Sequence, residues 1–85
     1  MYEIMTRNKK IKKRLYDYVN SRGDVLDKLK RLRLNPRKEC SAHPLHGRLK
    51  GKWACWIGSN IRLVYKIEDE NLIIMVEGIG SHKIY

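Results

Sequence analysis

The apolar residues of this chain change their spacing near its midpoint, and this change limits the possible folds more than any other feature. Between Asn8 and Pro36 they recur every three or four residues, which is the period of an amphipathic helix. Between Trp53 and Glu77 many of them alternate with polar residues, which is the period of a β-strand. In a chain of 85 residues, this pattern predicts one small domain of the α+β class.

Two helices are predicted in the first half. The first is expected over Asn8–Asn20, where one apolar stripe contains Ile11, Leu15, Tyr18 and Val19. Asn20–Gly23 is a break, because Gly23 can adopt the left-handed conformation that ends helices. Asp24 is expected to cap a second helix, whose apolar side comprises Val25, Leu26, Leu29 and Leu32. Pro36 ends that helix, and so short a break predicts an antiparallel helical hairpin.

Strands are predicted on both sides of the helices. Tyr2–Thr6 is a short β-prone run, and after a loop-like connector over 36–52 come Trp53–Ile57, Ile61–Ile67 and Leu72–Glu77. Short polar turns join the last three, which predicts an antiparallel meander. In the middle strand, alternation puts Ile61, Leu63, Tyr65 and Ile67 on one face and Arg62, Val64 and Lys66 on the other. The expected fold is therefore strand, helix, helix and a three-strand antiparallel meander, with the helical hairpin packed on one face of the sheet and residues 1–85 forming a single domain.

Charge narrows the classes of partner. Nineteen Lys and Arg residues against nine Asp and Glu give a net charge of +10, and the basic excess is concentrated in Arg7–Lys38. Such a balance favours a polyanion or an acidic protein partner. No apolar run approaches the length of a membrane span, and no signal peptide is evident, so a cytoplasmic location is expected. The two cysteines, Cys40 and Cys55, fit a reducing compartment.

The end of the chain carries residues that a hydrophobic core does not need. His82, Lys83 and Tyr85 fall within the last four residues. Together with Arg62 in a predicted strand, they form a candidate cationic acid–base site for an RNA phosphate. Trp53 and Trp56 have opposite parity, so at most one of them faces the core, and the other is available to RNA, a helix or a partner.

Three segments and the element order resemble the RelE/ParE toxin superfamily. The segments are HPLHGRLKG from His43, NIRLVYKIE from Asn60, and GSHKIY from Gly80. The resemblance is strongest to RelE-like and YafQ-like mRNA interferase toxins of type II toxin–antitoxin systems. It implies a ribosome-dependent mRNA endonuclease that directs a ribose 2′-hydroxyl at the adjacent phosphate without a metal or other cofactor. The implied partners are a cognate acidic antitoxin, the ribosome and mRNA.

The resemblance also implies roles for particular residues. Arg62 corresponds to the family's arginine that contacts the scissile phosphate, and His82 to its C-terminal acid–base histidine. Tyr85 matches the terminal aromatic residue, and His43 is a second acid–base candidate. RNA and ribosome contacts are expected from basic residues of the loop, tail and first helix: Arg48, Lys50, Lys52, Lys83, Lys9 and Lys13. The strand Trp53–Ile57 lacks the polar residues of the family, which leaves the general base open.

Three other interpretations stay open. A ParE-type toxin shares the fold and inhibits DNA gyrase without nuclease activity, although the GSHKIY ending argues against it. A basic RNA-binding module with weak or no catalysis is consistent with the missing strand residues. A zinc site is the third, because Cys40, His43 and His46 have C-x2-H-x2-H spacing and Cys55 is available as a fourth ligand.

Overall fold

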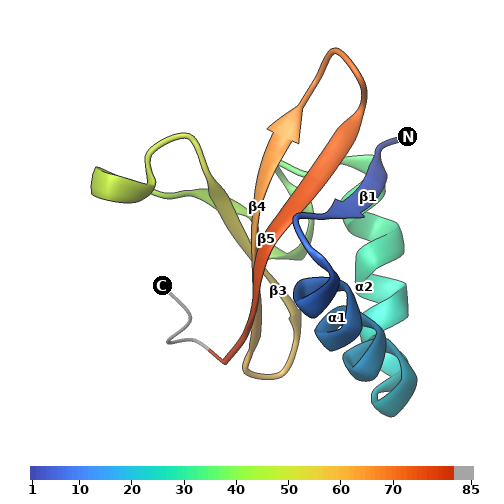
Figure 1. The fold of residues 1–85 in the computed structure, drawn as a ribbon. Helices are drawn as coiled ribbons and strands as arrows, with labels where there is room; N and C mark the ends of the chain where they lie inside the picture. Colours follow the sequence, from blue (N-terminus) through green and yellow to red (C-terminus); the bar gives the residue numbers. More distant parts are fainter. Residues whose placement is uncertain (82–85) are drawn as a thin grey trace.

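The computed structural model describes residues 1–81, and its elements follow the predicted order (Figure 1). They are β1 (Glu3–Thr6), α1 (Lys9–Ser21), α2 (Gly23–Leu34), the 3-10 turn η1 (Glu39–Ser41), β2 (His43–Pro44), the 3-10 turn η2 (Gly47–Leu49), β3 (Trp53–Gly58), β4 (Ile61–Glu68) and β5 (Ile73–Gly80). The predicted α+β class and its strand, helix, helix, three-strand order are confirmed.

The sheet has the strand order β1-β5-β4-β3-β2. Strands β3, β4 and β5 form the predicted antiparallel meander, and β1 is parallel to β5, with Glu3 opposite Ile73. The connector predicted as loop-like over 36–52 contains one strand, β2, where His43 pairs with Ala54 and Pro44 with Trp53. Two residues are too few for an alternating pattern, so no periodic signal marks this strand in the sequence.

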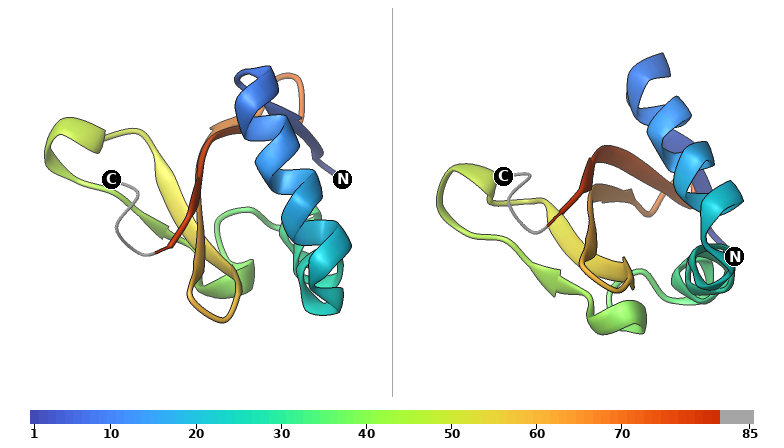
Figure 2. Two further views of the ribbon diagram at one scale, coloured as in Figure 1. Left: turned by 60° about the horizontal axis from the view of Figure 1, so that its bottom comes forward. Right: turned by 90° about the horizontal axis from the view of Figure 1, so that it is seen from below.

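The helical hairpin packs on one face of the sheet, as predicted (Figure 2). The break between the helices differs in detail from the prediction. Gly23 is the first residue of α2, and the chain turns at Arg22, whose extended φ of −137° interrupts the helical geometry. Asp24 does not cap α2: it lies in the first turn, with a carboxylate oxygen 3.7 Å from Arg22 Nε. Pro36 does end α2, because Asn35 is extended.

The main core lies between the helices and the sheet. Its buried members are Leu15, Val25, Leu29, Leu32, Cys55, Ile57, Ile61, Leu63, Tyr65, Ile74, Val76 and Ile79. The prediction that alternate residues of β4 share one face is confirmed at Ile61, Leu63 and Tyr65, which are all buried in this core. Ile67 also packs against the core but is half-buried. Leu26 contradicts the predicted apolar side of α2, since 46% of its surface is exposed. Within residues 1–81, no helix has the length and apolar character that crossing a membrane requires.

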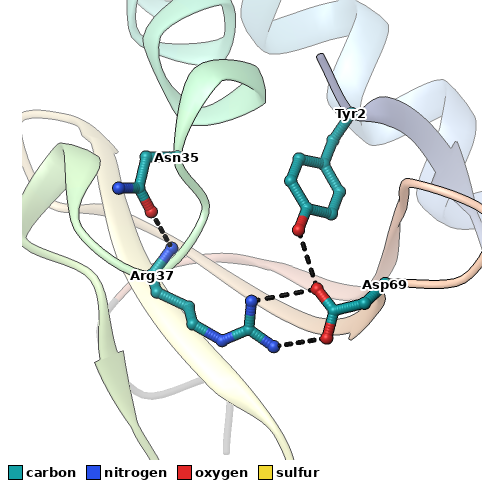
Figure 3. Close-up of polar contacts among 4 residues, drawn as sticks. All are labelled: Tyr2, Asn35, Arg37 and Asp69. Atoms are coloured by element: carbon teal, nitrogen blue, oxygen red, sulfur yellow. Dashed lines mark hydrogen bonds and ion pairs between the residues drawn. The ribbon is translucent and has the colours of Figure 1, made fainter.

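A polar cluster joins three distant parts of the chain (Figure 3). Arg37, in the connector after α2, contacts both carboxylate oxygens of Asp69, at 3.0 and 2.7 Å. Tyr2 donates a hydrogen bond of 2.7 Å to the same carboxylate. Asn35 holds the Arg37 backbone by accepting its N–H at 3.2 Å. The cluster fixes the start of the chain and the β4–β5 turn against the end of the helical hairpin.

Candidate nucleic-acid interface

The face of the sheet away from the helices carries the candidate site, and we call it the distal face. Because directly paired residues project to the same side, its rows can be read from the strand register. One row contains Trp56, Arg62 and Gly80, and the next contains His43, Ala54, Val64 and Gly78. Arg62 and Lys66 therefore share the distal face, as the alternation in β4 predicted.

An arm formed by residues 43–52 rises from the distal face. Figures 1 and 2 show this arm, which includes β2 and η2, on the side of the sheet opposite the helices. Leu45 is buried with Ala54 and Val64 in a second, smaller apolar cluster, and Leu49 packs against it. The cluster holds the base of the arm, while Arg48 and Lys50 stay exposed near its tip.

Arg62 lies over an aromatic ring on the middle strand of this surface, next to the β3–β4 turn. Its guanidinium carbon is 4.5 Å from the centroid of the Trp56 ring, and both side chains are half-buried. A cation at this distance is attracted by the ring face. A guanidinium that stacks by its face donates through its edges, and those edges match the geometry of phosphate oxygens.

The two tryptophan side chains lie on opposite faces of the sheet, as their alternation in the strand predicted. Trp53 packs against the main core, and Trp56 supports Arg62 on the distal face. Trp56 is the aromatic residue of the site that sequence reasoning did not assign. The signal was present in the short turn between β3 and β4, which places Trp56 directly opposite Arg62.

The histidines of the arm lie apart from Arg62. His43 is half-buried in β2, with Nδ1 3.1 Å from the carbonyl oxygen of Ser41. It shares the distal face with Arg62, but β3 lies between their strands, so their backbones are about 10 Å apart or more. His46 is exposed and precedes η2. The register therefore separates His43 from Arg62 by one strand and by two residue positions along the strand.

Lys52 is not a free loop cation. Its Nζ lies 2.7 Å from Oε1 of Glu77, and Nζ of Lys66 lies 3.9 Å from Oε2 of the same carboxylate. Glu77 is only 13% exposed. Sequence reasoning did not assign Glu77 to the site; it was expected to end the last strand, whereas β5 continues to Gly80.

The other predicted contact residues fall into two groups. Lys9 and Lys13 are exposed on α1, on the opposite side of the sheet from Arg62, and Lys13 lies 3.7 Å from Asp17. His82, Lys83 and Tyr85 lie outside the described residues, which end one position after Gly80, the residue opposite Arg62.

The four candidate zinc ligands do not converge. Cys55 is fully buried and belongs to the main core, whereas its strand neighbour Ala54 and the paired His43 belong to the distal face. Burial raises the pKa of the Cys55 thiol, which disfavours the thiolate that zinc needs. In the part of the chain that the structure describes, no group of three or more His, Cys, Asp or Glu side chains has a metal-binding arrangement.

Comparisons with known proteins agree with this architecture. A family model described as "Bacterial toxin of type II toxin-antitoxin system, YafQ" matches residues 4–84. A search of curated proteins finds no significant match.

Several solved structures share the fold. The YoeB–YefM complex from Staphylococcus aureus matches with a TM-score of 0.72 and 19% identity, covering 96% of this chain and 98% of that one. YafQ from Escherichia coli matches with a TM-score of 0.65 and 19% identity, over 96% and 94% of the two chains. A metal-bound toxin from Helicobacter pylori matches with a TM-score of 0.68 and 29% identity, over 96% of each chain. Because the family model spans nearly the whole sequence, this chain belongs to the YafQ toxin family of type II toxin–antitoxin systems.

Proposed function

We propose that the protein is an endonuclease that cleaves mRNA on the ribosome and that the distal face binds the scissile phosphate. The observation that carries this proposal is the stacking of Arg62 on Trp56, at the turn end of β3 and β4 and on the sheet surface that the helices leave uncovered. A guanidinium held in this way suits an anionic, pentacoordinate phosphate, because it supplies charge and donors without further reorganisation.

The proposed reaction is attack of a ribose 2′-hydroxyl on the adjacent phosphorus. The bond to the 5′-oxygen breaks, the 2′ proton passes to a general base, and the leaving oxygen takes a proton from a general acid. Arg62 stabilises the negative charge that grows on the phosphate oxygens. His82 is the proposed acid or base, and Tyr85 the proposed base-stacking or phosphate-contacting residue. His43 is a weaker candidate because of its distance from Arg62.

The proposed partner is an acidic antitoxin protein. The chain has a net charge of +10, and similar solved structures include the YoeB–YefM toxin–antitoxin complex from S. aureus and the RelBE2 complex from Mycobacterium tuberculosis. An acidic partner that covers the distal face or the C-terminal segment would block RNA. The exposed cations Arg48, Lys50, Lys9 and Lys13 are proposed ribosome contacts, because they are solvent-facing and serve no core function.

The test is a translation reaction in vitro with purified toxin, followed by primer extension on the mRNA. Wild-type protein is expected to produce discrete cleavage sites in translated mRNA and none in naked mRNA. Arg62→Ala is expected to lower the cleavage rate at least a hundredfold, because it removes the charge that faces the phosphate. Arg62→Lys is expected to recover only part of that loss, since an ammonium cannot donate in a fork.

Each contrary result has a clear meaning. Full cleavage by Arg62→Ala would exclude the assigned phosphate site. Absence of cleavage by the wild type, together with inhibition of DNA gyrase in a supercoiling assay, would replace the nuclease with a ParE-type activity. A His82→Ala variant that cleaves at the wild-type rate would remove the proposed acid–base role of the tail.

A further inference from the structure

Two lysines of the distal face are neighbours across the sheet. Trp53 pairs with Tyr65 in the antiparallel β3–β4 register, so Lys52, one residue before Trp53, lies opposite Lys66. Like charges directly opposite each other on one face repel. Glu77 offsets this repulsion, because its two carboxylate oxygens face the two ammonium groups, at 2.7 Å from Lys52 and 3.9 Å from Lys66.

A β-bulge brings Glu77 to this position. Val64 pairs with Gly78 and Tyr65 with Val76, so Glu77 is the extra residue of β5 and has no register partner on β4. Bulges of this kind re-aim one side chain while the rest of the strand keeps its pairing. Val76 and Ile79 stay in the main core on either side, which shows that the bulge accommodates Glu77 without disturbing the core.

The exposures of the three side chains form a gradient. Glu77 is 13% exposed, Lys52 26% and Lys66 53%. The main chain of Lys52 is fixed as well, since its N–H donates to Leu49 at 3.0 Å and its carbonyl accepts from Leu45 at 2.9 Å. The cluster therefore holds two cations and one shielded anion in a fixed arrangement, with an excess of one positive charge and one ammonium turned to solvent.

The Lys52–Glu77–Lys66 cluster lies on the same face as Arg62 but further along β4. Arg62 and Lys66 are four residues apart on β4, which places their Cα atoms about 13 Å apart. That distance is too large for both to hold one phosphate. We propose that Lys52 and Lys66 form a second RNA phosphate subsite, which binds a nucleotide neighbouring the scissile one, and that Glu77 is the positioning residue that fixes the two lysines. This inference rests on the proposed RNA substrate.

The arrangement favours a nucleic-acid backbone over other anions. A nucleotide chain that crosses the distal face at Arg62 presents further phosphates along its length, and β4 runs from one cation to the next. The excess of one charge matches a single phosphodiester. A carboxylate from an acidic protein partner is the competing occupant, and the experiment separates the two.

The first measurement is binding of a short single-stranded RNA that carries 2′-O-methyl groups and cannot be cleaved, titrated against the full chain at several salt concentrations. Lys66→Ala is expected to reduce the slope of log K against log salt by about 0.7, the value for one phosphate contact on a single strand. Lys30→Ala is the matched control, because it removes the same charge from an exposed lysine of α2, on the other side of the sheet. This variant is expected to keep the wild-type slope. This measurement does not depend on cleavage.

The second measurement uses Glu77→Gln, which keeps the shape of the side chain and removes its charge. RNA is expected to bind this variant at least as tightly as the wild type, because the cluster gains a positive charge. The cleavage kcat on ribosomes is expected to fall about tenfold with KM unchanged, since misplaced lysines shift the substrate. A purely structural role for Glu77 predicts instead a lower melting temperature with kcat restored on cooling.

The outcomes distinguish this subsite from the nuclease activity itself. Wild-type cleavage that depends on Arg62, with an unchanged salt slope for Lys66→Ala and an unchanged kcat for Glu77→Gln, would overturn the subsite alone. A Lys66→Ala variant that weakens only a complex with an acidic protein partner would assign the cluster to a protein interface and overturn it too. If the wild-type protein never cleaves mRNA but Lys66→Ala still lowers the salt slope of RNA binding, the subsite is supported and the nuclease activity is refuted.

Discussion

At the scale of single residues, Tyr65 connects the sheet to the segment that follows the helices. Its side chain is fully buried in the main core, and its hydroxyl donates to the Pro36 carbonyl oxygen at 2.5 Å. Burial raises the pKa of this hydroxyl, so it stays a neutral donor at physiological pH. Pro36 is fully buried, and the hydroxyl is therefore the means by which its carbonyl is satisfied.

Tyr65→Phe removes this donor and leaves the ring in place. We expect the free energy of unfolding to fall by about 1–3 kcal/mol, the cost of leaving a buried carbonyl without its partner. Urea unfolding followed by tryptophan fluorescence measures the change. Tyr16→Phe is the control, because Tyr16 is 57% exposed and its loss of a hydroxyl should leave the midpoint unchanged. Equal midpoints for wild type and Tyr65→Phe would contradict the role of the hydroxyl.

Residue-level prediction succeeded where a regular strand decides the direction of a side chain. Simple alternation was enough to place Arg62 on the face opposite Leu63, and the structure agrees. Glu77 was missed because a bulge breaks that alternation, and a bulge depends on the partner strand rather than on local residues. The ion pair of Lys52 was missed because its partner Glu77 lies 25 positions later in the chain and reaches it only through that bulge.

At the scale of elements, α1 begins at a side-chain cap. Asn8 is extended and its side-chain oxygen accepts the N–H of Ile11 at 2.9 Å, which satisfies one of the unpaired donors of the first turn. Lys9 and Lys10 follow, and the first turn contains no acidic residue. The two lysines are unfavourable at the positive end of the helix dipole, so the Asn8 cap stabilises a helix start that its charges destabilise.

Asn8→Ala is expected to destabilise the protein by about 1 kcal/mol, because the cap bond is lost. Asn8→Asp is the informative comparison: it keeps the acceptor and adds a negative charge near the helix N-terminus, so its stability should equal or exceed that of the wild type. Thermal unfolding by circular dichroism gives both values. An Asn8→Ala variant as stable as Asn8→Asp would show that the cap contributes nothing.

Element boundaries were predictable where the sequence carries strong local signals. Pro36 marked the end of α2, and the polar turns marked the ends of β4. The break between the helices was located but misread, since Arg22 adopts the extended conformation and Gly23 does not supply a left-handed turn. The short β2 had no local signal at all: its pairing with β3 arises from the closure of the arm, which is anchored by Leu45.

At the scale of the whole molecule, the two faces of the sheet are used differently. One is covered by the helical hairpin and buries the main core, while the other carries Arg62, Trp56 and the Lys52–Glu77–Lys66 cluster. A chain of 85 residues is long enough for one such core, and the distal face buries only the smaller cluster of Leu45, Ala54 and Val64. This division follows from the switch between helical and strand spacing that the sequence shows at its midpoint.

The Tyr2–Arg37–Asp69 cluster joins the start of the chain, the connector after α2 and the β4–β5 turn (Figure 3). Because it contains charged groups, it makes the stability of the fold depend on pH. Arg37 first, and then the Tyr2 hydroxyl, lower the pKa of Asp69 to about 2 from 3.8. A carboxyl whose pKa is lower in the folded state stabilises the fold above the unfolded value and loses that contribution as pH falls through the folded value. Asp69→Asn is therefore expected to lower stability by a constant amount above pH of about 5, and the difference should shrink as pH falls below about 4 and vanish only below about 2. Urea unfolding of both proteins across this range measures it, with Glu70→Gln in the same turn as a control that should follow the wild type. A difference that persists unchanged at the lowest pH would mean that Asp69 acts through packing and not through its charge.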